Sequence, residues 1–385
     1  MTHPRGFPET EYSERLTNIQ SRMAEHDLSA LLLTTEPEVR YLTGFLTRFW
    51  ESPTRPWFLV VPASGKPIAV IPEIGAHLMR QTWIDDIRTW VSPDYTDDGV
   101  SLLADTLAEV APKRGRIGVP SGPETHLRMP LQDWTTLRDR LPDRVFCDDA
   151  AILRSARMVK SKAEIAKIRW TCGIAEAAFA RVNDIAGAGI PLSTVFRSFQ
   201  SLLLDEGADW VPYLAGAAAP GGYGDVISPA TNAPLEEGCV LMLDTGAVWD
   251  GYFCDFDRNF SIGAPSDDVQ SAHARLIDAT HAGFEAARPG ATPAEVYAAM
   301  NLVLTGGDTS VKGRLGHGLG MQLTEPPSLI PADHTPLVPG MVLTLEPVVE
   351  TQTGIMVHEE NIVVTEDGAD WLTMPVGHAI PQVDP

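Results

Sequence analysis

Residues 243–260 read LDTGAVWDGYFCDFDRNF and decide the fold of the second half of the chain. Asp250-Gly251 is a strong signal for a tight turn between two strands, because both central positions of the favoured hairpin turn need a positive φ. The turn lies about midway between Asp244 and Asp255. This predicts that the two carboxylates are cross-strand neighbours, with Cβ atoms ~4.5–5.5 Å apart. Two opposed acids on apolar strands are destabilising unless a cation neutralises them.

A second stretch repeats this arrangement about a hundred residues later. Residues 343–361 read LTLEPVVETQTGIMVHEEN, and the turn at 351–354 lies about midway between Glu346 and Glu360. These acids are therefore also expected to be cross-strand neighbours. His317, in the glycine-rich run RLGHGLGM, lies between the two stretches. One acidic pair near a turn is usually solvated, but two pairs and a glycine-flanked histidine predict a metal site with room for two ions.

The composition excludes several classes of partner. The chain has 385 residues, 44% of them hydrophobic and 21% charged, which is ordinary for a globular protein of two or three domains. Its net charge of −22 would repel nucleic acid and anionic membranes, so neither is expected as a partner. The four cysteines form no CxxC pair, and no signal peptide or membrane span is recognisable, so a cytoplasmic protein is expected.

The order of apolar patterns predicts two domains. Short apolar runs at 28–35 and 57–72, the second a hairpin, alternate with helical patterns at 100–110 and 129–141. This alternation predicts an α/β domain over residues 1–155.

The second domain, 156–385, is predicted to be α+β, with antiparallel hairpins and helices packed on one side of them. Its first long helix is expected after Ser161, which forms a capping box with Glu164. Further helices are expected at 265–288 and 293–305.

These motifs resemble those of the pita-bread metallohydrolases, which include aminopeptidase P, prolidase, methionine aminopeptidase and the creatinase-like proteins. The family's patterns occur as DxG…GYxxDxxR from Asp244 to Arg258, GHGxG at 316–320, GMVxTxEP at 340–347, E-[DN] at Glu360-Asn361, YLTGF at 41–45 and KSxxEI at 160–165. The resemblance covers nearly the whole chain. It implies a creatinase-like N-terminal domain followed by a pita-bread catalytic domain.

The resemblance also implies a dinuclear metal centre. Asp244 would chelate one ion, Asp255 and Glu360 would bridge both ions, and His317 and Glu346 would complete the shell of the other. One imidazole and four carboxylates suit Mn²⁺, Fe²⁺, Co²⁺ or Zn²⁺. Two such ions lower the pKa of a water between them, and Glu346 would relay its proton, as its family equivalent is thought to do.

Several positions depart from the peptidase members of the family. Thr324 stands where they have a histidine seven residues after the metal-binding histidine, and the loop 224–229 lacks their other histidine. Thr324 and the following Glu325 are expected to line the substrate pocket. His358 replaces the arginine two residues before the last glutamate, and Asp257 replaces a threonine.

His358 is hypothesised to act in catalysis, with Asp257 as its acid–base or supporting partner. The alternative interpretations are a surface residue for His358 and, for Asp257, a salt bridge to Arg258 or another cation. Arg258 and Trp50 are predicted to contact substrate. Trp50 belongs to the aromatic loop 48–57, which either packs locally or forms a lid for the other subunit, as in dimers of the family.

The function that follows is a cytoplasmic, homodimeric, two-metal hydrolase. It would cleave an amide or C–N bond in a dipeptide, with Xaa-Pro the family's default, or in another small molecule. One alternative is a non-peptide member: an ectoine-type or creatine-type hydrolase, or a lyase of a small sulfonium acid. Another is an inactive binding protein on the same fold, which the complete set of metal ligands disfavours.

Overall fold

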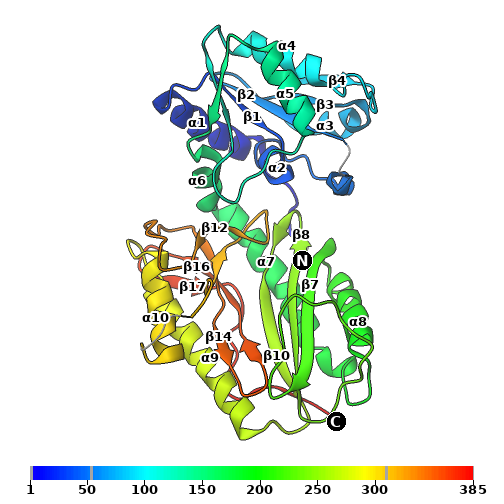
Figure 1. Cartoon of the computed structure of the whole chain (residues 1–385), viewed down its shortest axis with the longest axis vertical. Helices are drawn as coiled ribbons and strands as arrows, with labels where there is room; N and C mark the ends of the chain where they lie inside the picture. The colour runs from blue at the N-terminus through cyan, green and yellow to red at the C-terminus, as the bar shows by residue number, and fades with distance from the viewer. Residues whose placement is uncertain (1–2, 53–54, 308–310, 385) are drawn as a thin grey trace. The chain divides into compact units, whose positions relative to one another are not determined.

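A computed structural model describes residues 3–52, 55–307 and 311–384. The chain divides into two compact units, one extending to Arg157 and the other beginning at Met158 (Figure 1). The division lies two residues beyond the expected domain boundary at 155/156. It falls within α6 (Ile152–Met158).

The N-terminal unit is built on one mixed sheet. Its strands are, in spatial order, β4 (Asp86–Trp90), β3 (Ile68–Pro72), β2 (Phe58–Pro62), β1 (Ala30–Leu33), β5 (Arg116–Val119) and β6 (Val145–Asp148). Strands β2 and β3 form the expected antiparallel hairpin. Strands β1, β5 and β6 are parallel, as the alternation of strands and helices indicates.

Helices surround this sheet and bury its apolar side chains. They are α1 (Glu9–Glu25), α2 (Glu36–Thr43), α3 (Ala76–Met79), α4 (Val100–Val110), α5 (Leu131–Arg140) and the 3-10 turns η1 (Arg48–Glu51) and η2 (Glu73–Gly75). One core cluster joins α4 to the central strands, with Leu103 and Leu107 fully buried against residues such as Leu32 and Val60.

Two main sheets carry the second unit. The first runs β18 (Gln382–Val383), β10 (Phe256–Ile262), β8 (Cys239–Trp249) and β7 (Trp210–Pro220), with β9 (Tyr252–Phe253) paired to the end of β8. The second runs β12 (Glu325–Ser328), β11 (His317–Gly318), β13 (Val342–Leu345), β16 (Glu360–Val364) and β17 (Ala369–Trp371), and β14 (Val348–Glu350) pairs with β15 (Ile355–Val357) in a separate ribbon. Strand β10 of the first sheet contacts β16 of the second.

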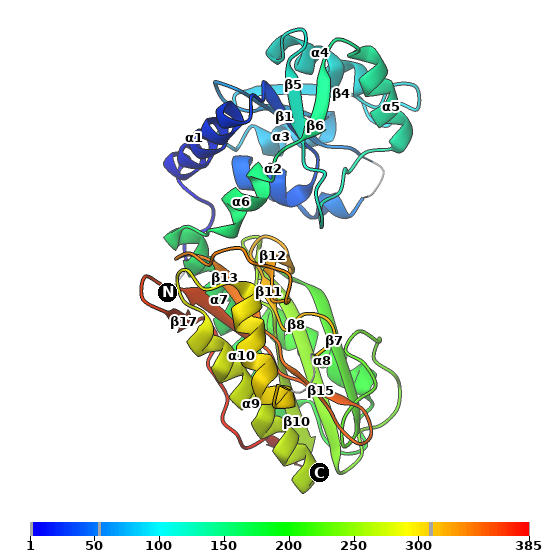
Figure 2. The ribbon, with the colours of Figure 1, turned by 60° about the vertical axis from the view of Figure 1, so that its left-hand side comes forward.

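The helices of this unit form two pairs, and one pair lies against each of the two main sheets. Helices α7 (Lys162–Phe179) and α8 (Leu192–Asp205), joined through the short η3 (Val182–Asp184), pack on β8 and β7. Helices α9 (Asp267–Ala286) and α10 (Pro293–Thr305) lie side by side (Figure 2), and α9 packs on β13 of the second sheet and on the β14–β15 ribbon. Each sheet is apolar on its outer face and needs its own cover.

Local signals in the sequence account for these boundaries. Ser161 and Glu164 form the expected capping box at the start of α7, which supplies two of the backbone partners that a helix end lacks. Asp250 and Gly251 have φ of 49° and 80°, as the hairpin turn requires. Within the described ranges, no helix has the length and apolar character needed to cross a bilayer.

Candidate metal centre

The strand register of the first hairpin brings a different acid opposite Asp244 from the one expected. Asp244 pairs with Asp257, while Asp255 lies two residues earlier on β10's side of the hairpin. The register follows from the pairing of Val248 with Phe253 and of Trp249 with Tyr252, beside the two-residue turn. Because side chains alternate with period two, Asp255 and Asp257 share the face of Asp244. The prediction that Asp244 and Asp255 are directly opposed is therefore wrong, and they are diagonal neighbours.

The second hairpin shows a similar shift, and here it changes which acid joins the cluster. Leu345 pairs with Glu360 in the ladder between β13 and β16, so Glu346 comes opposite Glu359. A one-residue shift moves a side chain to the other face of a sheet. The prediction that Glu346 and Glu360 are cross-strand neighbours is wrong for this reason, and Glu359 takes the position expected of Glu360.

Glu359 lies with Asp255 and His317 in a buried cluster. Each of the three offers one ligand atom, and these atoms lie within 4.8 Å of one another. His317 Nε2 is 3.4 Å from Asp255 Oδ2. His317 Nδ1 faces the carbonyl oxygen of Gly318 at 2.8 Å, and since a carbonyl only accepts, Nδ1 carries the hydrogen. The lone pair of Nε2 therefore points toward the acids, as in metal-binding histidines.

The glycines around His317 are explained by close approach of other strands. A Cβ on Gly316 would lie 2.2 Å from the carbonyl oxygen of Thr344, and one on Gly318 would lie 2.3 Å from that of Pro326. The His317 amide also donates to Thr344 Oγ1 at 3.1 Å. These contacts fix the backbone on both sides of the imidazole, which limits how far it can move.

The electrostatics show that the acids of this cluster need a positive charge. Burial, and then Glu346, raise the pKa of Asp244 to about 7. Burial also raises the pKa of Asp255, of Glu346 and of Glu359, and neighbouring acids add to the effect for Asp255 and Glu359. Burial and the charge of Arg314 lower the pKa of His317 to about 4, so its imidazole is neutral at pH 7.

The residues present fit divalent metal ions. Within the described ranges, Asp244 Oδ1 and Glu359 Oε1 are buried and have no hydrogen-bond partner, although buried carboxylate oxygens are normally paired or metal-bound. Several carboxylates and one neutral imidazole form a hard, oxygen-rich donor set for first-row divalent ions. The cluster thus has both the donors and the unmet negative charge of a metal site.

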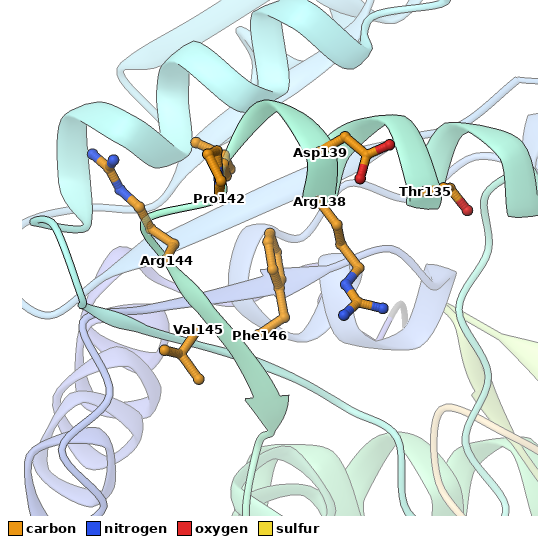
Figure 3. Close-up of a pocket in the computed structure, with 8 residues that line it drawn as sticks. Thr135, Arg138, Asp139, Pro142, Arg144, Val145 and Phe146 are labelled. Atoms are coloured by element: carbon orange, nitrogen blue, oxygen red, sulfur yellow. The ribbon is translucent and has the colours of Figure 1, made fainter.

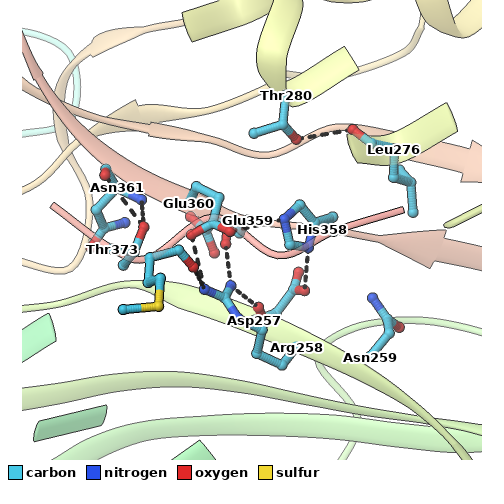
Figure 4. A network of polar contacts seen from close by, with 12 residues as sticks. Asp257, Arg258, Asn259, Leu276, Thr280, His358, Glu359, Glu360, Asn361 and Thr373 are labelled. Carbon is cyan, nitrogen blue, oxygen red and sulfur yellow. Dashed lines mark hydrogen bonds and ion pairs between the residues drawn. The ribbon is translucent and has the colours of Figure 1, made fainter. Parts of the chain in front are cut away.

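Glu360 is held differently, by Arg258 and His358 (Figure 4). Arg258 Nη2 donates to Glu360 Oε2 at 2.9 Å, and His358 Nε2 is 3.2 Å from Glu360 Oε1. Burial would raise the pKa of Glu360, but the charge of Arg258 and the contact with His358 outweigh it and lower that pKa. Glu360 is therefore an ionised partner of Arg258, and its expected role as a bridging ligand stays a prediction.

Arg258 and His358 are both buried inside this network. The Arg258 guanidinium also donates to the main-chain oxygens of Asp257 and Glu359, and its expected contact with substrate stays a prediction. His358 is 1% exposed, which makes the surface-residue interpretation wrong. Its Nδ1 is 3.9 Å from Asp257 Oδ1, and its catalytic role stays a prediction.

Glu325 has a structural role as well. It is 3% exposed and accepts from Lys160 Nζ at 3.2 Å and from the amides of Met321 and Gln322 at 3.0 and 3.1 Å. These bonds hold the loop that follows His317, so the expectation that Glu325 lines the substrate pocket is not supported. Thr324 accepts from Arg314 Nη2 at 3.3 Å.

Trp50 belongs to a packed aromatic cluster in the N-terminal unit. Its ring lies 5.6 Å from that of Trp57 and 6.5 Å from that of Phe45, and Arg128 covers it at 5.2 Å. Trp50 is 7% exposed. The local-packing interpretation of the aromatic loop therefore describes Trp50, and its expected contact with substrate stays without support.

Sequence reasoning missed Asn361, which connects the two hairpins. Asp255 donates its amide to Asn361 Oδ1 at 3.1 Å, and Asn361 Nδ2 donates back to the Asp255 carbonyl. Cys172 Sγ is 3.4 Å from the same Oδ1. Tyr213, whose hydroxyl donates to Asp244 Oδ2 at 3.1 Å, was also missed. No sequence signal distinguishes Tyr213, whereas Glu359 was visible in the run HEEN.

A pocket of ≈ 560 Å³ in the N-terminal unit lacks the acids and the histidine of a metal site. It lies between α5 and β6, and Arg138, Asp139, Arg144 and Phe146 are among the residues that line it (Figure 3). Arg144 donates to two main-chain oxygens at the end of α4. Its lining residues include a single acid and no histidine, so the site of chemistry is assigned to the second unit.

The fold and the acid–imidazole cluster define a metal-dependent hydrolase. Residues 166–366 match the model of metallopeptidase family M24, and residues 15–159 match the creatinase/prolidase N-terminal domain. The chain belongs to metallopeptidase family M24. This confirms the expected fold class, an α/β creatinase-like domain followed by an α+β pita-bread domain.

Individual relatives agree with this assignment. The chain is 30% identical over 370 residues to "Probable dipeptidase PepE" of Mycobacterium tuberculosis, covering 95% of each. It is 23% identical to an Xaa-Pro dipeptidase of Pyrococcus horikoshii (94% and 97% covered) and 24% identical to an ectoine hydrolase of Halomonas elongata (95% and 96%). The crystal structure of dipeptidase PepE from Mycobacterium ulcerans superposes with a TM-score of 0.84 and 28% identity, covering 98% and 100%.

Proposed function

We propose that this chain is a two-metal hydrolase of dipeptides, with Xaa-Pro dipeptides as the first substrates to test. The observation that carries the proposal is the buried cluster of Asp255, His317 and Glu359, in a chain whose relatives include an Xaa-Pro dipeptidase and PepE. Bound ions would supply Lewis acidity and an activated water. The proposed ligands are Asp244, Asp255, His317, Glu346 and Glu359, with Glu359 replacing Glu360.

Glu346 is proposed to carry a proton during the reaction. It lies opposite Glu359, and its amide donates to the Leu315 carbonyl at 2.9 Å, which anchors it beside the His317 segment. Burial raises its pKa and Arg314 opposes that rise. A carboxyl group with a raised pKa next to the reacting bond can accept and return a proton near neutral pH.

The cellular setting is also a proposal. Of the four cysteines, which are all free, Cys172, Cys239 and Cys254 are buried, as in proteins of a reducing compartment, and this supports a cytoplasmic enzyme. The homodimer rests on the family resemblance alone.

A substrate panel tests the proposed function. The protein, reconstituted with Mn²⁺ or Co²⁺, is expected to hydrolyse Gly-Pro and similar dipeptides with a kcat of ~1–10³ per second. The measurement is release of free proline, compared with small cyclic amides and zwitterions under the same conditions.

The second candidate is a hydrolase of a compact non-peptide amide. Two observations favour it: Thr324 stands at the position of a peptidase histidine, and one relative is named an ectoine hydrolase. Turnover of a cyclic amide without turnover of any dipeptide would replace the first proposal by this one. Two bound ions with no turnover across the whole panel would contradict both.

Arg314 is proposed to bind the carboxylate of the substrate. It is exposed, lies three residues before His317, and donates to Thr324 Oγ1. In the described part of the chain its guanidinium forms no ion pair. Arg258, whose charge lowers the pKa of Asp257 and of Glu360, is already bound to Glu360. Arg314 is therefore the cation that remains available for an anionic group of the substrate.

Replacing Arg314 by glutamine is expected to weaken the preference for a free carboxylate. The ratio of kcat/KM for Gly-Pro to that for its C-terminal amide should fall on the order of 10- to 100-fold, because charge-assisted hydrogen bonds are lost. Lys312→Gln is the matched control, since Lys312 is an exposed cation two residues earlier, and it should leave the ratio unchanged. An unchanged ratio in Arg314→Gln would contradict the proposal that Arg314 binds the carboxylate of the substrate.

A further inference from the structure

Asp257 is a buried acid that the proposed centre does not use. It is 1% exposed and lies directly opposite Asp244 in the ladder between β8 and β10. Opposed residues of an antiparallel pair have Cβ atoms ~4.5–5.5 Å apart, and like charges there are destabilising. The side chain of Asp257 shares the face on which Asp244 and Asp255 lie. A third carboxylate is thus built into the floor of the site.

The groups nearest to Asp257 do not neutralise it. Its Oδ1 is buried and has no hydrogen-bond partner among the residues that the structure describes. Arg258 donates to the main-chain oxygen of Asp257, and its Nη2 is committed to Glu360 and the Met374 carbonyl. A buried acid in this position needs a cation that the side chains around it do not provide.

His358 is the other candidate partner, and its distance is too long. Its Nδ1 is 3.9 Å from Asp257 Oδ1, beyond the range of a hydrogen bond, and that nitrogen also has no hydrogen-bond partner in the described ranges. The other ring nitrogen is 3.2 Å from Glu360. The imidazole therefore lies next to Asp257 at the range of an ion pair but forms no hydrogen bond with it (Figure 4).

We propose that Asp257 is an additional ligand of the ion held by Asp244, an inference that rests on the proposed metal centre. Asp244 and Asp257 would both be ligands of that ion, Asp255 would serve both ions, and His317 and Glu359 would be ligands of the other. An extra carboxylate adds a hard oxygen donor and a negative charge to the site of the ion held by Asp244. Hard, oxygen-rich positions suit Mn²⁺ better than ions that prefer nitrogen or sulfur donors, so this position should favour Mn²⁺ over Zn²⁺ more than the other does.

The test is direct measurement of metal binding by Asp257→Asn. Titration calorimetry of the metal-free protein with Mn²⁺ should show two ions bound by the wild type, and one of them at least ~10-fold more weakly by the variant. Low-temperature electron paramagnetic resonance should show a weaker Mn²⁺–Mn²⁺ coupling signal at equal loading. Asn has the shape of a protonated Asp. If Asp257 is only a neutral hydrogen-bonding group, the variant will bind both ions as the wild type does, and the proposal is overturned.

Two further variants remove the remaining explanations. His358→Gln should leave Mn²⁺ affinity near that of the wild type. An equal loss in His358→Gln would mean that Asp257 acts through the imidazole, which also overturns the proposal. Asp278→Asn removes an exposed acid of α9 and is the control for net charge.

The outcome is separable from that of the proposed function. Fewer than one ion per wild-type chain would remove the metal centre itself, whereas two ions in both wild type and Asp257→Asn would remove only the role of Asp257. The metal-free variant is expected to fold, because Asn keeps the size of the side chain and Asp257 Oδ1 has no hydrogen bond to lose in the described ranges. If circular dichroism shows that it does not, Asp257→Thr, the residue that the peptidase members carry, is measured in the same way and interpreted by the same criteria.

Discussion

Replacing Asp255 by alanine is expected to abolish metal loading and hydrolysis together. Asp255 is the acid that joins the two hairpins: its carboxylate faces His317 Nε2 at 3.4 Å, and its pKa responds to burial, Asp244 and Glu346. Without it, neither proposed ion keeps its ligand set. We expect fewer than one ion per chain after reconstitution, and a fall in kcat/KM on the order of 10³ or more, equivalent to ~4 kcal/mol of transition-state stabilisation.

The matched control is Asp367→Ala, which removes an exposed aspartate of the same unit whose side chain accepts from Thr365 Oγ1. It should load metal and turn over as the wild type does. Elemental analysis and the proline-release assay on the same preparation give both readings. Full loading in Asp255→Ala would mean that the cluster is not the metal site.

Glutamine substitutions at Glu359 and Glu360 are expected to have opposite effects, although the residues are adjacent. Glu359→Gln removes a proposed ligand, so metal should be lost and activity should fall with it. Glu360→Gln leaves the metal ligands in place and instead leaves Arg258, which is 6% exposed, without its carboxylate. Breaking a buried ion pair in this way costs about 3–5 kcal/mol, and chemical denaturation of the metal-free proteins should detect it.

Each variant is the control of the other, because both convert a buried glutamate to an amide of the same size. The contrary result would be loss of metal in Glu360→Gln and full metal loading in Glu359→Gln. That result would restore Glu360 as the bridging ligand and contradict the assignment made from the strand register.

Most elements of the fold could be predicted because their signals are local. The capping box at Ser161 and Glu164 sets the start of α7 within a few residues, and the apolar pattern at 100–110 coincides with α4. Asp250-Gly251 identifies the hairpin because few other residues tolerate its backbone angles. These features depend on neighbours in the sequence, so no tertiary information was needed.

The register of the strands could not be predicted to the nearest residue. A turn midway between two acids fits several pairings, and Asp244 opposite Asp257 differs from the expected pairing by two residues. In the second hairpin the difference is one residue, which is enough to exchange Glu359 for Glu360. The kinds of residue in the cluster were therefore predictable, but the choice between adjacent acids required the structure.

The roles of Arg258 and Glu325 were not predictable for a different reason. Each lies in a motif next to a proposed ligand, but its partner comes from far away in the chain: Glu360 for Arg258 and Lys160 for Glu325. A motif shows that a residue is near the site. It does not show whether the side chain faces the substrate or the protein interior.

The reciprocal amide contact between Asn361 and the backbone of Asp255 has a consequence for how such enzymes diversify. It ties one sheet to the other through the Asn361 side chain and the Asp255 backbone, so the spacing of the ligands does not depend on the residues that contact substrate. Positions such as Thr324 can then change without loosening the framework that carries the acids. A scaffold with this independence can acquire new substrates by few substitutions, because a change in the substrate pocket leaves the acidic cluster in place.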